Sequence, residues 1–228
     1  MDVAITSVPL GFCQCYVLRG DGVIVVDAGA PNNGSRLLHA LQSEHISPSD
    51  LNLVVITHGH WDHIGSAAEI KAATGAKIAM HHAEVGWLEN SLKPLSPGVT
   101  VWGKILRAMH RPFMPLIDIP ATDVNIVLDD EPFSLWAYGI PGQVIHTPGH
   151  SPGSVSLLLE SGDAFVGDLA MNRLPLRFSP GLPIFADRPS AVIKSWKMLL
   201  ELGAKMVFPA HGKPFPSAII ARKIAKFE

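Results

Sequence analysis

The stretch LNLVVITHGHWDHI, residues 51–64, joins a predicted buried strand to four candidate metal ligands. Residues 51–57 are mostly apolar and β-branched, which is typical of a strand covered on both faces. A helix is predicted over 64–74, with Gly75 as its C-cap. Imidazole nitrogen and carboxylate oxygen are zinc ligands, and alternate residues of an extended loop point the same way. We therefore interpret the segment between strand and helix as a metal-binding loop, with ligands His58, His60, Asp62 and His63.

Three further candidate ligands follow other apolar segments. His150 lies in the turn-forming stretch TPGHSPG, residues 147–153, and His211 lies in PAHG, residues 209–212. Asp168 directly follows the short run AFVG, residues 164–167. A carboxylate at the end of a buried strand is costly unless it is paired or bound to metal. Two more imidazoles and a carboxylate that could bridge two ions therefore complete a candidate dinuclear centre.

The rest of the chain alternates short predicted strands with helices, which indicates an α/β fold. The first strands resemble an antiparallel meander, and the two halves repeat one plan in which strands lead to a metal-type loop. Predicted strands cover 3–7, 14–19, 23–27, 51–57, 76–80, 124–128, 133–137, 143–147, 154–159, 163–167 and 206–209. Predicted helices cover 34–44, 64–74, 82–91, 189–202 and 217–227.

Composition narrows the class of protein. Of 228 residues, 47% are hydrophobic and 17% charged, and the net charge is −2. This is a globular composition without a basic run, so we expect no nucleic-acid partner. The N-terminus lacks the features of a secretory signal, and apolar runs are too short for a membrane span, so we expect a cytoplasmic protein. Cys13 and Cys15 are interpreted as small buried apolar side chains rather than a redox or metal pair.

In their order and spacing, the motifs THGHWDH, TPGHSPGS, VGD and PAHG resemble those of the metallo-β-lactamase superfamily. The resemblance covers almost the whole chain. It implies a single domain over 1–228 with a four-layer αβ/βα sandwich of two mixed β-sheets flanked by helices. It also implies two zinc ions, with iron or manganese as alternatives. His58, His60 and His150 would hold one ion, Asp62, His63 and His211 the other, and Asp168 would bridge them. Asp27 in VVDAG matches a supporting aspartate, or else is a plain turn residue at a strand end.

The resemblance implies a dinuclear-zinc hydrolase in which a metal-bridging hydroxide attacks the substrate, with Asp62 orienting the nucleophile or relaying its proton. Departures from several subfamilies narrow the substrate. Asp168 stands where secreted β-lactamases with a cysteine ligand have that cysteine, and the C-terminal helices of glyoxalase II-like thioesterases are missing. We expect an ester, lactone or thioester substrate. The alternatives are β-lactamase or phosphodiesterase activity, a mononuclear-iron sulfur dioxygenase, and a non-catalytic binding protein.

An apolar helical insertion is predicted at about 84–120, where prolines flank one amphipathic stretch. Trp102, Ile105, Leu106 and Met109 follow helical spacing, which predicts a helix that faces the core. The alternative is that residues 101–118 form a lid over the substrate or a contact in a homodimer. A second apolar segment, 174–185, could line the same pocket, so we expect a small-molecule substrate with an apolar part. The other histidines are interpreted as surface or strand-end residues: His39, His45, His81, His82, His110 and His146.

Overall fold

A computed structural model of the chain describes residues 2–225. The first sheet contains six strands in sequential order, β1 (Ala4–Leu10), β2 (Cys13–Arg19), β3 (Val23–Val26), β4 (Leu51–Val55), β5 (Lys77–His81) and β6 (Ile126–Leu128). The first three strands pair antiparallel, as the predicted meander requires, and β3 to β6 pair in parallel. Each parallel strand of this sheet therefore delivers its following loop to the same edge.

The second sheet has the order β12 (Phe215–Pro216), β11 (Met206–His211), β10 (Asp163–Met171), β9 (Val155–Leu159), β8 (Gly142–His146) and β7 (Phe133–Ser134). Only β10 and β11 pair in parallel. The strand predicted over 133–137 ends at Ser134, because a 3₁₀ turn (η3, Trp136–Tyr138) follows and closes on Gly139 in the left-handed conformation. Strand β10 runs to Met171, four residues beyond its predicted end.

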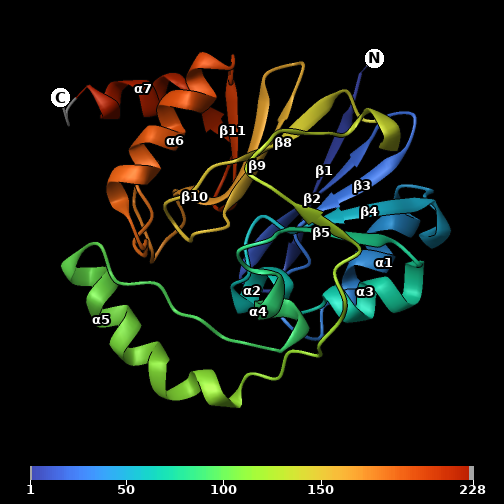
Figure 1. The fold of residues 1–228 in the computed structure, drawn as a ribbon, viewed down its shortest axis with the longest axis horizontal. Coiled ribbons are helices and arrows are strands. Elements are labelled where there is room, and N and C mark those ends of the chain that lie inside the picture. The colour runs from blue at the N-terminus through green and yellow to red at the C-terminus, as the bar shows by residue number, and fades with distance from the viewer. Residues whose placement is uncertain (1, 226–228) are drawn as a thin grey trace.

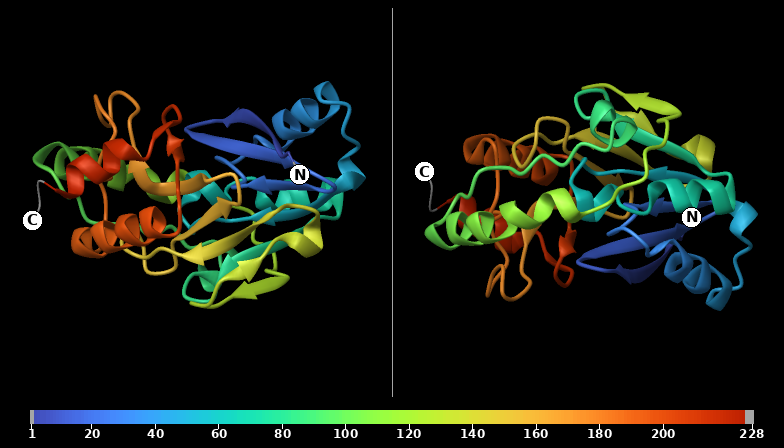
Figure 2. Two further views of the ribbon diagram at one scale, coloured as in Figure 1. Left: turned by 90° about the horizontal axis from the view of Figure 1, so that it is seen from above. Right: turned by 90° about the horizontal axis from the view of Figure 1, so that it is seen from below.

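The two sheets face each other, and helices cover their outer faces, which confirms the predicted four-layer sandwich (Figures 1 and 2). One core cluster lies between the sheets and combines side chains such as Ile24 and Val55 with Leu157 and Phe165. Alternate residues of the first sheet, such as Val54, pack outward under α1 (Gly34–Ser43) and α3 (Ala67–Thr74). A third cluster joins the second sheet to α6 (Pro189–Glu201) and α7 (Ala218–Ile224).

The helix predicted over 64–74 forms only from Ala67, as α3. A separate short helix, α2 (Trp61–Ile64), begins inside the metal-binding loop and ends at the first residue of the predicted range. The interruption fits the packing of Gly65, where an added Cβ would lie 2.3 Å from Cδ of Pro31. The helix predicted over 82–91 is shorter, α4 (Val85–Glu89), and η1 (Pro48–Asp50) precedes β4.

The amphipathic helix α5 (Val101–His110) forms as predicted, but the prediction that it faces the core is wrong. Trp102, Ile105 and Met109 are 43%, 46% and 59% exposed, and only Leu106 of the four apolar residues is buried. Together with η2 (Arg111–Leu116), α5 stands away from the two sheets in Figure 1. Leu106 packs on Met171 and Ile184, so α5 is attached to the segment that follows β10 rather than to the main core.

The prediction for the two cysteines agrees with the structure. Cys13 and Cys15 are buried thiols of β2 that form no disulfide, as expected for small apolar side chains. Among residues 2–225, no helix has both the length and the apolar character needed to cross a bilayer. That residues 84–120 are an insertion into one domain stays a prediction.

Candidate metal centre

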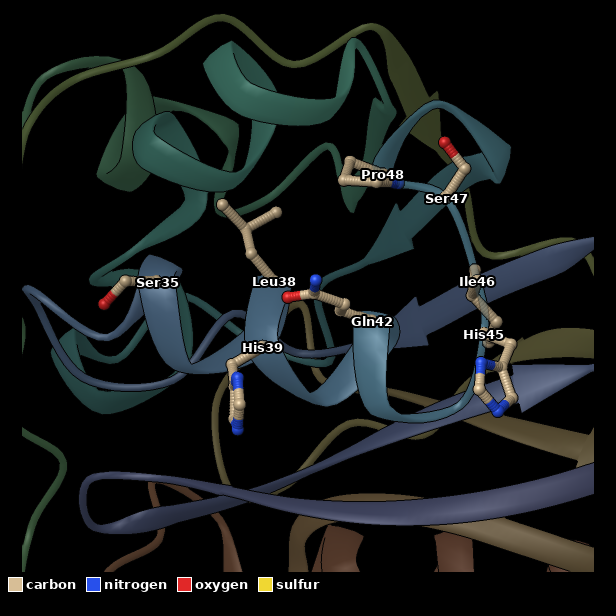
Figure 3. A pocket seen from close by; sticks show the side chains of 8 residues that line it. All are labelled: Ser35, Leu38, His39, Gln42, His45, Ile46, Ser47 and Pro48. Carbon is tan, nitrogen blue, oxygen red and sulfur yellow. The ribbon is translucent and has the colours of Figure 1, made fainter.

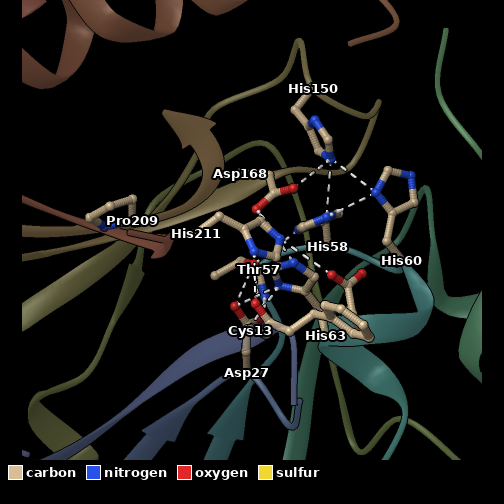
Figure 4. A network of polar contacts seen from close by, with 12 residues as sticks. Cys13, Asp27, Thr57, His58, His60, His63, His150, Asp168, Pro209 and His211 are labelled. Carbon is tan, nitrogen blue, oxygen red and sulfur yellow. Dashed lines mark hydrogen bonds and ion pairs between the residues drawn. The ribbon is translucent and has the colours of Figure 1, made fainter. Parts of the chain in front are cut away.

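The seven side chains singled out in the sequence lie together where the strands of both sheets end, and all of them except Asp62 are labelled in Figure 4. His58, His60, Asp62 and His63 follow β4 of the first sheet. His150 follows β8, Asp168 lies in β10, and His211 ends β11, so these three come from the second sheet. All are buried except Asp62, which is partly accessible. The fold thus brings together every candidate ligand from segments up to about 150 residues apart.

Three histidines form the first group. Nε2 of His58 lies 3.1 Å from Nδ1 of His60, and Nε2 of His150 lies 3.1 Å and 2.9 Å from those same two atoms. Three ring nitrogens therefore converge on one point. Ligands about 2.0–2.1 Å from a tetrahedral zinc ion are separated by about 3.3 Å, so this spacing is close to that of a three-histidine site.

Asp62, His63 and His211 form the second group, and Asp168 lies between the two groups. Nε2 of His211 lies 3.3 Å from Oδ2 of Asp62 and 3.2 Å from Oδ1 of Asp168. The other oxygen of Asp168, Oδ2, lies 3.6 Å from Nε2 of His150 in the first group. The two carboxylate oxygens of Asp168 thus face different groups, as a bridging ligand requires.

Gly167 explains how Asp168 reaches this position. Its φ is +51°, and an added Cβ would lie 2.4 Å from Oγ1 of Thr57, the residue before His58. Only glycine allows the backbone of β10 to approach the first loop so closely. The sequence signal VGD therefore places the carboxylate against the loop that carries four of the other candidates.

The outer nitrogen of each histidine contacts a polar group that orients the ring. Nδ1 of His63 donates to Oδ2 of Asp27 at 2.9 Å, and Nδ1 of His150 donates to the carbonyl of Phe185 at 2.8 Å. Nδ1 of His211 donates to the carbonyl of Phe12 at 2.9 Å. Carboxylates and carbonyls accept only, so the neutral rings carry their lone pair on Nε2, toward the centre. Metal-binding histidines are held in this way.

The residues fit divalent ions. Nε2 of His63 and Oδ1 of Asp168 are buried atoms without a hydrogen-bond partner among the described residues. When the His63 ring is neutral, both atoms have lone pairs, and they lie 3.5 Å apart. Burial opposes a charged His63, but Cys13, Asp27 and Asp168 raise its pKa well above its usual value, so in metal-free protein a proton is the cation between the two atoms. Two acceptors that face each other in a buried site are unfavourable unless a cation lies between them. The arrangement of the ligand atoms therefore suits two ions, one in each group.

Electrostatics differ between the two groups. Burial lowers the pKa of His58 well below its usual value, and neighbouring histidines lower it further. Burial also lowers the pKa of His150, and it lowers that of His60 to about 3. The first group is therefore neutral at pH 7, which is the state that binds metal.

The second group carries the acidic residues. Burial opposes the charged form of Asp62, but His63 and His211 outweigh it and lower its pKa to about 2. Burial likewise opposes a charged His211, but Asp168 and Asp62 raise its pKa to about 10. In the absence of ions, a proton on His211 therefore balances part of the carboxylate charge.

Asp27 supports the first loop, as the resemblance implied. Its Oδ1 accepts from the backbone N–H of Thr57 at 2.8 Å and from the Thr57 hydroxyl at 2.9 Å, while Oδ2 orients His63. Asp27 is 1% exposed and has a φ of +64°. Positive φ is uncommon for residues other than glycine, and aspartate tolerates it better than most. Its role is therefore more than that of a strand-ending turn.

Sequence reasoning missed Glu84, which lies at the start of α4 and is completely buried. Oε2 of Glu84 accepts from the N–H of Gly59 at 2.6 Å, and Oε1 accepts from the N–H of Gly153 at 2.7 Å. One glycine lies between His58 and His60, and the other lies three residues after His150. Glu84 therefore ties the metal loop of the first sheet to that of the second, although burial raises its pKa.

The segment that leads to α5 also touches the centre. The hydroxyl of Ser96 donates to the carbonyl of His150 at 3.1 Å and lies 3.4 Å from Nε2 of His60. Ser96 is 5% exposed. The backbone next to Ser96 pairs with the segment after β10, because the N–H of Ala186 donates to the carbonyl of Pro97. The two apolar segments are thus joined beside the first group of histidines.

A surface hollow of about 660 Å³ lies elsewhere, along α1 and the loop before β4 (Figure 3). It is lined by Ser35, Leu38, His39, Gln42, His45, Ile46, Ser47 and Pro48, and it contains none of the seven candidate ligands. Its side chains are those of an ordinary amphipathic helix and its following turn. We therefore assign the chemistry to the histidine and aspartate groups and not to this hollow.

The remaining histidines divide into two kinds. His39, His45, His82 and His110 are exposed, as predicted. His81, predicted on a helix or loop surface, is instead buried at the end of β5, and His146 ends β8 as predicted but is partly buried. These two rings stack on each other with centroids 4.1 Å apart.

The chain matches the family model of the metallo-beta-lactamase superfamily over residues 8–211. It is 31% identical to an uncharacterized protein of Mycobacterium leprae, with 91% of each chain covered. It is 28% identical to a probable metallo-hydrolase of Bacillus subtilis, with 84% of this chain and 75% of that protein covered.

Solved structures have the same fold. BLEG-1, a B3 metallo-beta-lactamase, matches with a TM-score of 0.72 at 22% identity and covers 94% of this chain and 95% of its own. An archaeal metallo-beta-lactamase superfamily protein from Sulfolobus tokodaii matches with a TM-score of 0.70 at 22% identity, covering 99% and 86%. TTHA1623 in a di-iron-bound form matches with a TM-score of 0.68 at 25% identity, covering 95% and 97%.

Proposed function

We propose, since the chain belongs to the metallo-beta-lactamase superfamily, that it is a hydrolase with a dinuclear metal centre. The observation that carries the proposal is the direction of the ring nitrogens. The outer nitrogens of His63, His150 and His211 are engaged by groups that only accept, so the inner nitrogen of each neutral ring presents its lone pair to the centre. Asp168 directs one oxygen to each group.

In this proposal, one ion binds to the inner nitrogens of His58, His60 and His150. The other binds to Asp62, His63 and His211, and Asp168 contributes to both. Zinc is the expected metal because this set combines imidazole and carboxylate without a soft ligand. Iron is the alternative, supported by the two irons bound in the structurally similar TTHA1623.

When bound, two such ions lower the pKa of water to about 7 and polarise a substrate carbonyl, which makes hydroxide available at neutral pH. Within the chain, Asp62 is the group best suited to hold the attacking water. It is the one candidate ligand of the seven that is not buried, with 14% of its side chain accessible. Its pKa of about 2 keeps it ionised at neutral pH, so its carboxylate can accept a hydrogen bond from the attacking water and orient it.

We further propose a substrate with an ester, lactone or thioester bond and an apolar part. Phe12, whose carbonyl orients His211, exposes 62% of its surface, and its ring contacts Trp61 at 5.6 Å. On the other side of the centre, the ring of Trp87 stacks on His60 at 6.2 Å. Aromatic side chains next to the candidate ligands favour apolar groups on the substrate.

Elemental analysis of protein purified without added metal, combined with an activity panel, tests the proposal. We expect close to two transition-metal equivalents per chain and turnover of esters, lactones or thioesters that stops on chelation and returns with zinc. The panel includes β-lactams and phosphodiesters. Preference for either of these would replace the proposed substrate class. A single tightly bound iron without hydrolysis would instead indicate a sulfur dioxygenase.

A further inference from the structure

A second cluster of histidines lies outside the centre described above. It is formed by His81 at the end of β5, His146 at the end of β8, and Asp130 in the connection between β6 and β7. Oδ1 of Asp130 lies 3.1 Å from Nε2 of His81 and 3.0 Å from Nδ1 of His146. One histidine thus comes from each sheet, and the aspartate comes from the connection that joins the sheets.

The proton of His146 can be assigned from its neighbours. Nε2 of His146 lies 2.9 Å from the carbonyl oxygen of Pro152, which only accepts, so Nε2 carries the proton. In the neutral ring, Nδ1 is then a lone pair that faces the carboxylate of Asp130 at 3.0 Å. Two acceptors at this distance repel each other unless a cation, either a proton or a metal ion, lies between them.

The geometry favours a metal ion as that cation. The three ligand atoms all lie within 4.8 Å of one another, and the ring-to-carboxylate distances of 3.0 and 3.1 Å resemble those between the inner nitrogens of the first group. Two imidazoles and one carboxylate form a recognised ligand set for zinc. We propose that His81, Asp130 and His146 form an additional site for a divalent transition-metal ion, distinct from the dinuclear centre.

Surface access and a fourth ligand are available. The side chain of Asp130 is 72% exposed, so an ion can enter from solvent and the carboxylate can move to admit it. Nε2 of His82, which is half-exposed, lies 3.8 Å from the same oxygen of Asp130 and could supply another ligand. A water molecule would serve equally well in an open position.

His81 sets the strength of the site. Its Nδ1 accepts from the N–H of Ala83 at 3.3 Å, so its proton lies on Nε2, toward Asp130. An ion can bind Nε2 only if that proton moves to Nδ1, and the hydrogen bond from Ala83 is then lost. We expect a weaker site than the dinuclear centre. Once bound, the ion would link both sheets and their connection.

The test is metal stoichiometry on the purified, metal-replete protein. Equilibrium dialysis against micromolar zinc should give one equivalent more for the wild type than for Asp130→Asn or His146→Ala. The exposed Asp130→Asn is the main variant, since His146→Ala also removes the contact with Pro152. His110→Ala, which removes an exposed histidine of α5, is the matched control and should retain the additional equivalent.

A spectroscopic measurement identifies the ligands. With the dinuclear centre loaded with zinc, one added Cu²⁺ should give an electron paramagnetic resonance signal with coupling to two imidazole nitrogens, and Asp130→Asn should weaken or alter it. Equal metal stoichiometry in the wild type and Asp130→Asn, with a copper signal unchanged by the substitution, would overturn the proposal. The cation between Asp130 and His146 would then be a proton and not a metal ion. Because the comparison is a difference between variants, it stands even if the dinuclear centre holds fewer than two ions.

Discussion

The two oxygens of Asp168 face different partners, Oδ2 toward His150 and Oδ1 toward His63 and His211. Asp168→Ala removes both contacts and leaves two groups of ligands without a shared carboxylate. We expect metal content to fall from two ions toward one or none, with turnover reduced more than about 100-fold, beyond the loss usual for a supporting residue. Asp163→Ala, a partly exposed aspartate of the same strand, is the control. Wild-type metal content and activity in Asp168→Ala would contradict the bridging role.

Glu84 acts on the centre through the backbone. It accepts from Gly59 and Gly153 in two different metal loops. Glu84→Gln preserves size but replaces one acceptor oxygen by an NH₂ donor, so one glycine N–H loses its partner and the loops separate. We expect metal affinity to fall about 10–100-fold, as for other residues that hold ligands in place.

Competition with a chelator measures that loss of affinity. Glu89→Gln, an exposed position in the same helix α4, serves as its control. If Glu84→Gln is merely less stable, with metal affinity equal to that of the wild type, then Glu84 has a structural role alone.

Among the single elements, helix α5 is held by few contacts with the rest of the chain. Its apolar residues are exposed, but the indole N–H of Trp102 donates to the carbonyl of Pro175 at 2.9 Å, and Leu106 packs on Met171 and Ile184. The helix is therefore held by the segment that follows Asp168. This placement favours a wall or lid of the substrate pocket over a core helix.

Trp102→Ala and Phe113→Ala test that interpretation. Both side chains are partly exposed, so we expect a stability loss well below the roughly 3–5 kcal/mol of a buried aromatic residue. We expect KM for apolar substrates to rise several-fold with kcat little changed. Lys104→Ala, on the same helix, should leave both constants unchanged. Unaltered specificity together with a shift from dimer to monomer in solution would assign α5 to a subunit contact instead.

Elements with a strong local pattern were predictable. The β-branched run that ends in Thr57 and the turn-rich TPGHSPG segment identified the strands and loops that carry the candidate ligands. The segment that packs against α5 could not be predicted, because helical periodicity reveals an apolar face and not what covers it. The break between α2 and α3 was also missed. It lies where Gly65 packs closely on Pro31, and a contact between residues so far apart leaves no local signal.

Within the site, the seven candidate ligands could be identified because they lie in short motifs with a recognisable order and spacing. Glu84 and Asp130 could not be identified, because each is a single acidic residue whose partners come from distant segments of the chain. His81 was predicted on the surface, since a histidine at a strand end carries no mark of burial. Tertiary contacts alone decide these three positions.

On the scale of the whole molecule, the metal centre links stability to pH. In metal-free protein, the pKa of His211 is raised to about 10, above its unfolded value of about 6.5. Its contribution to stability is therefore fully present below pH 6.5 and is lost as pH rises through 10. We expect chelated protein to lose stability between pH 7 and 10, as followed by denaturant unfolding. Metal-loaded protein, in which ions replace that proton, should lose less. Parallel curves would contradict this account.

The two sheets are also joined by Tyr16, which connects the core to the metal centre. Tyr16 lies in β2, is 2% exposed, and donates its hydroxyl to the carbonyl of Pro209 in β11 at 2.7 Å. Pro209 lies two residues before His211, so this contact helps to position the end of β11. The ring packs edge-on against Phe165 and Phe208 in the second sheet.

Tyr16→Phe keeps this packing and removes the hydrogen bond alone. The Pro209 carbonyl would be left buried without its donor, which costs about 1–3 kcal/mol. We expect the free energy of unfolding to fall by that amount and a chelator to remove metal faster, because His211 is less firmly held. Tyr138→Phe is the control, since no partner of the Tyr138 hydroxyl is found within residues 2–225. If the unfolding energy falls while metal release stays at the wild-type rate, then the contact stabilises the interface between the sheets without positioning His211.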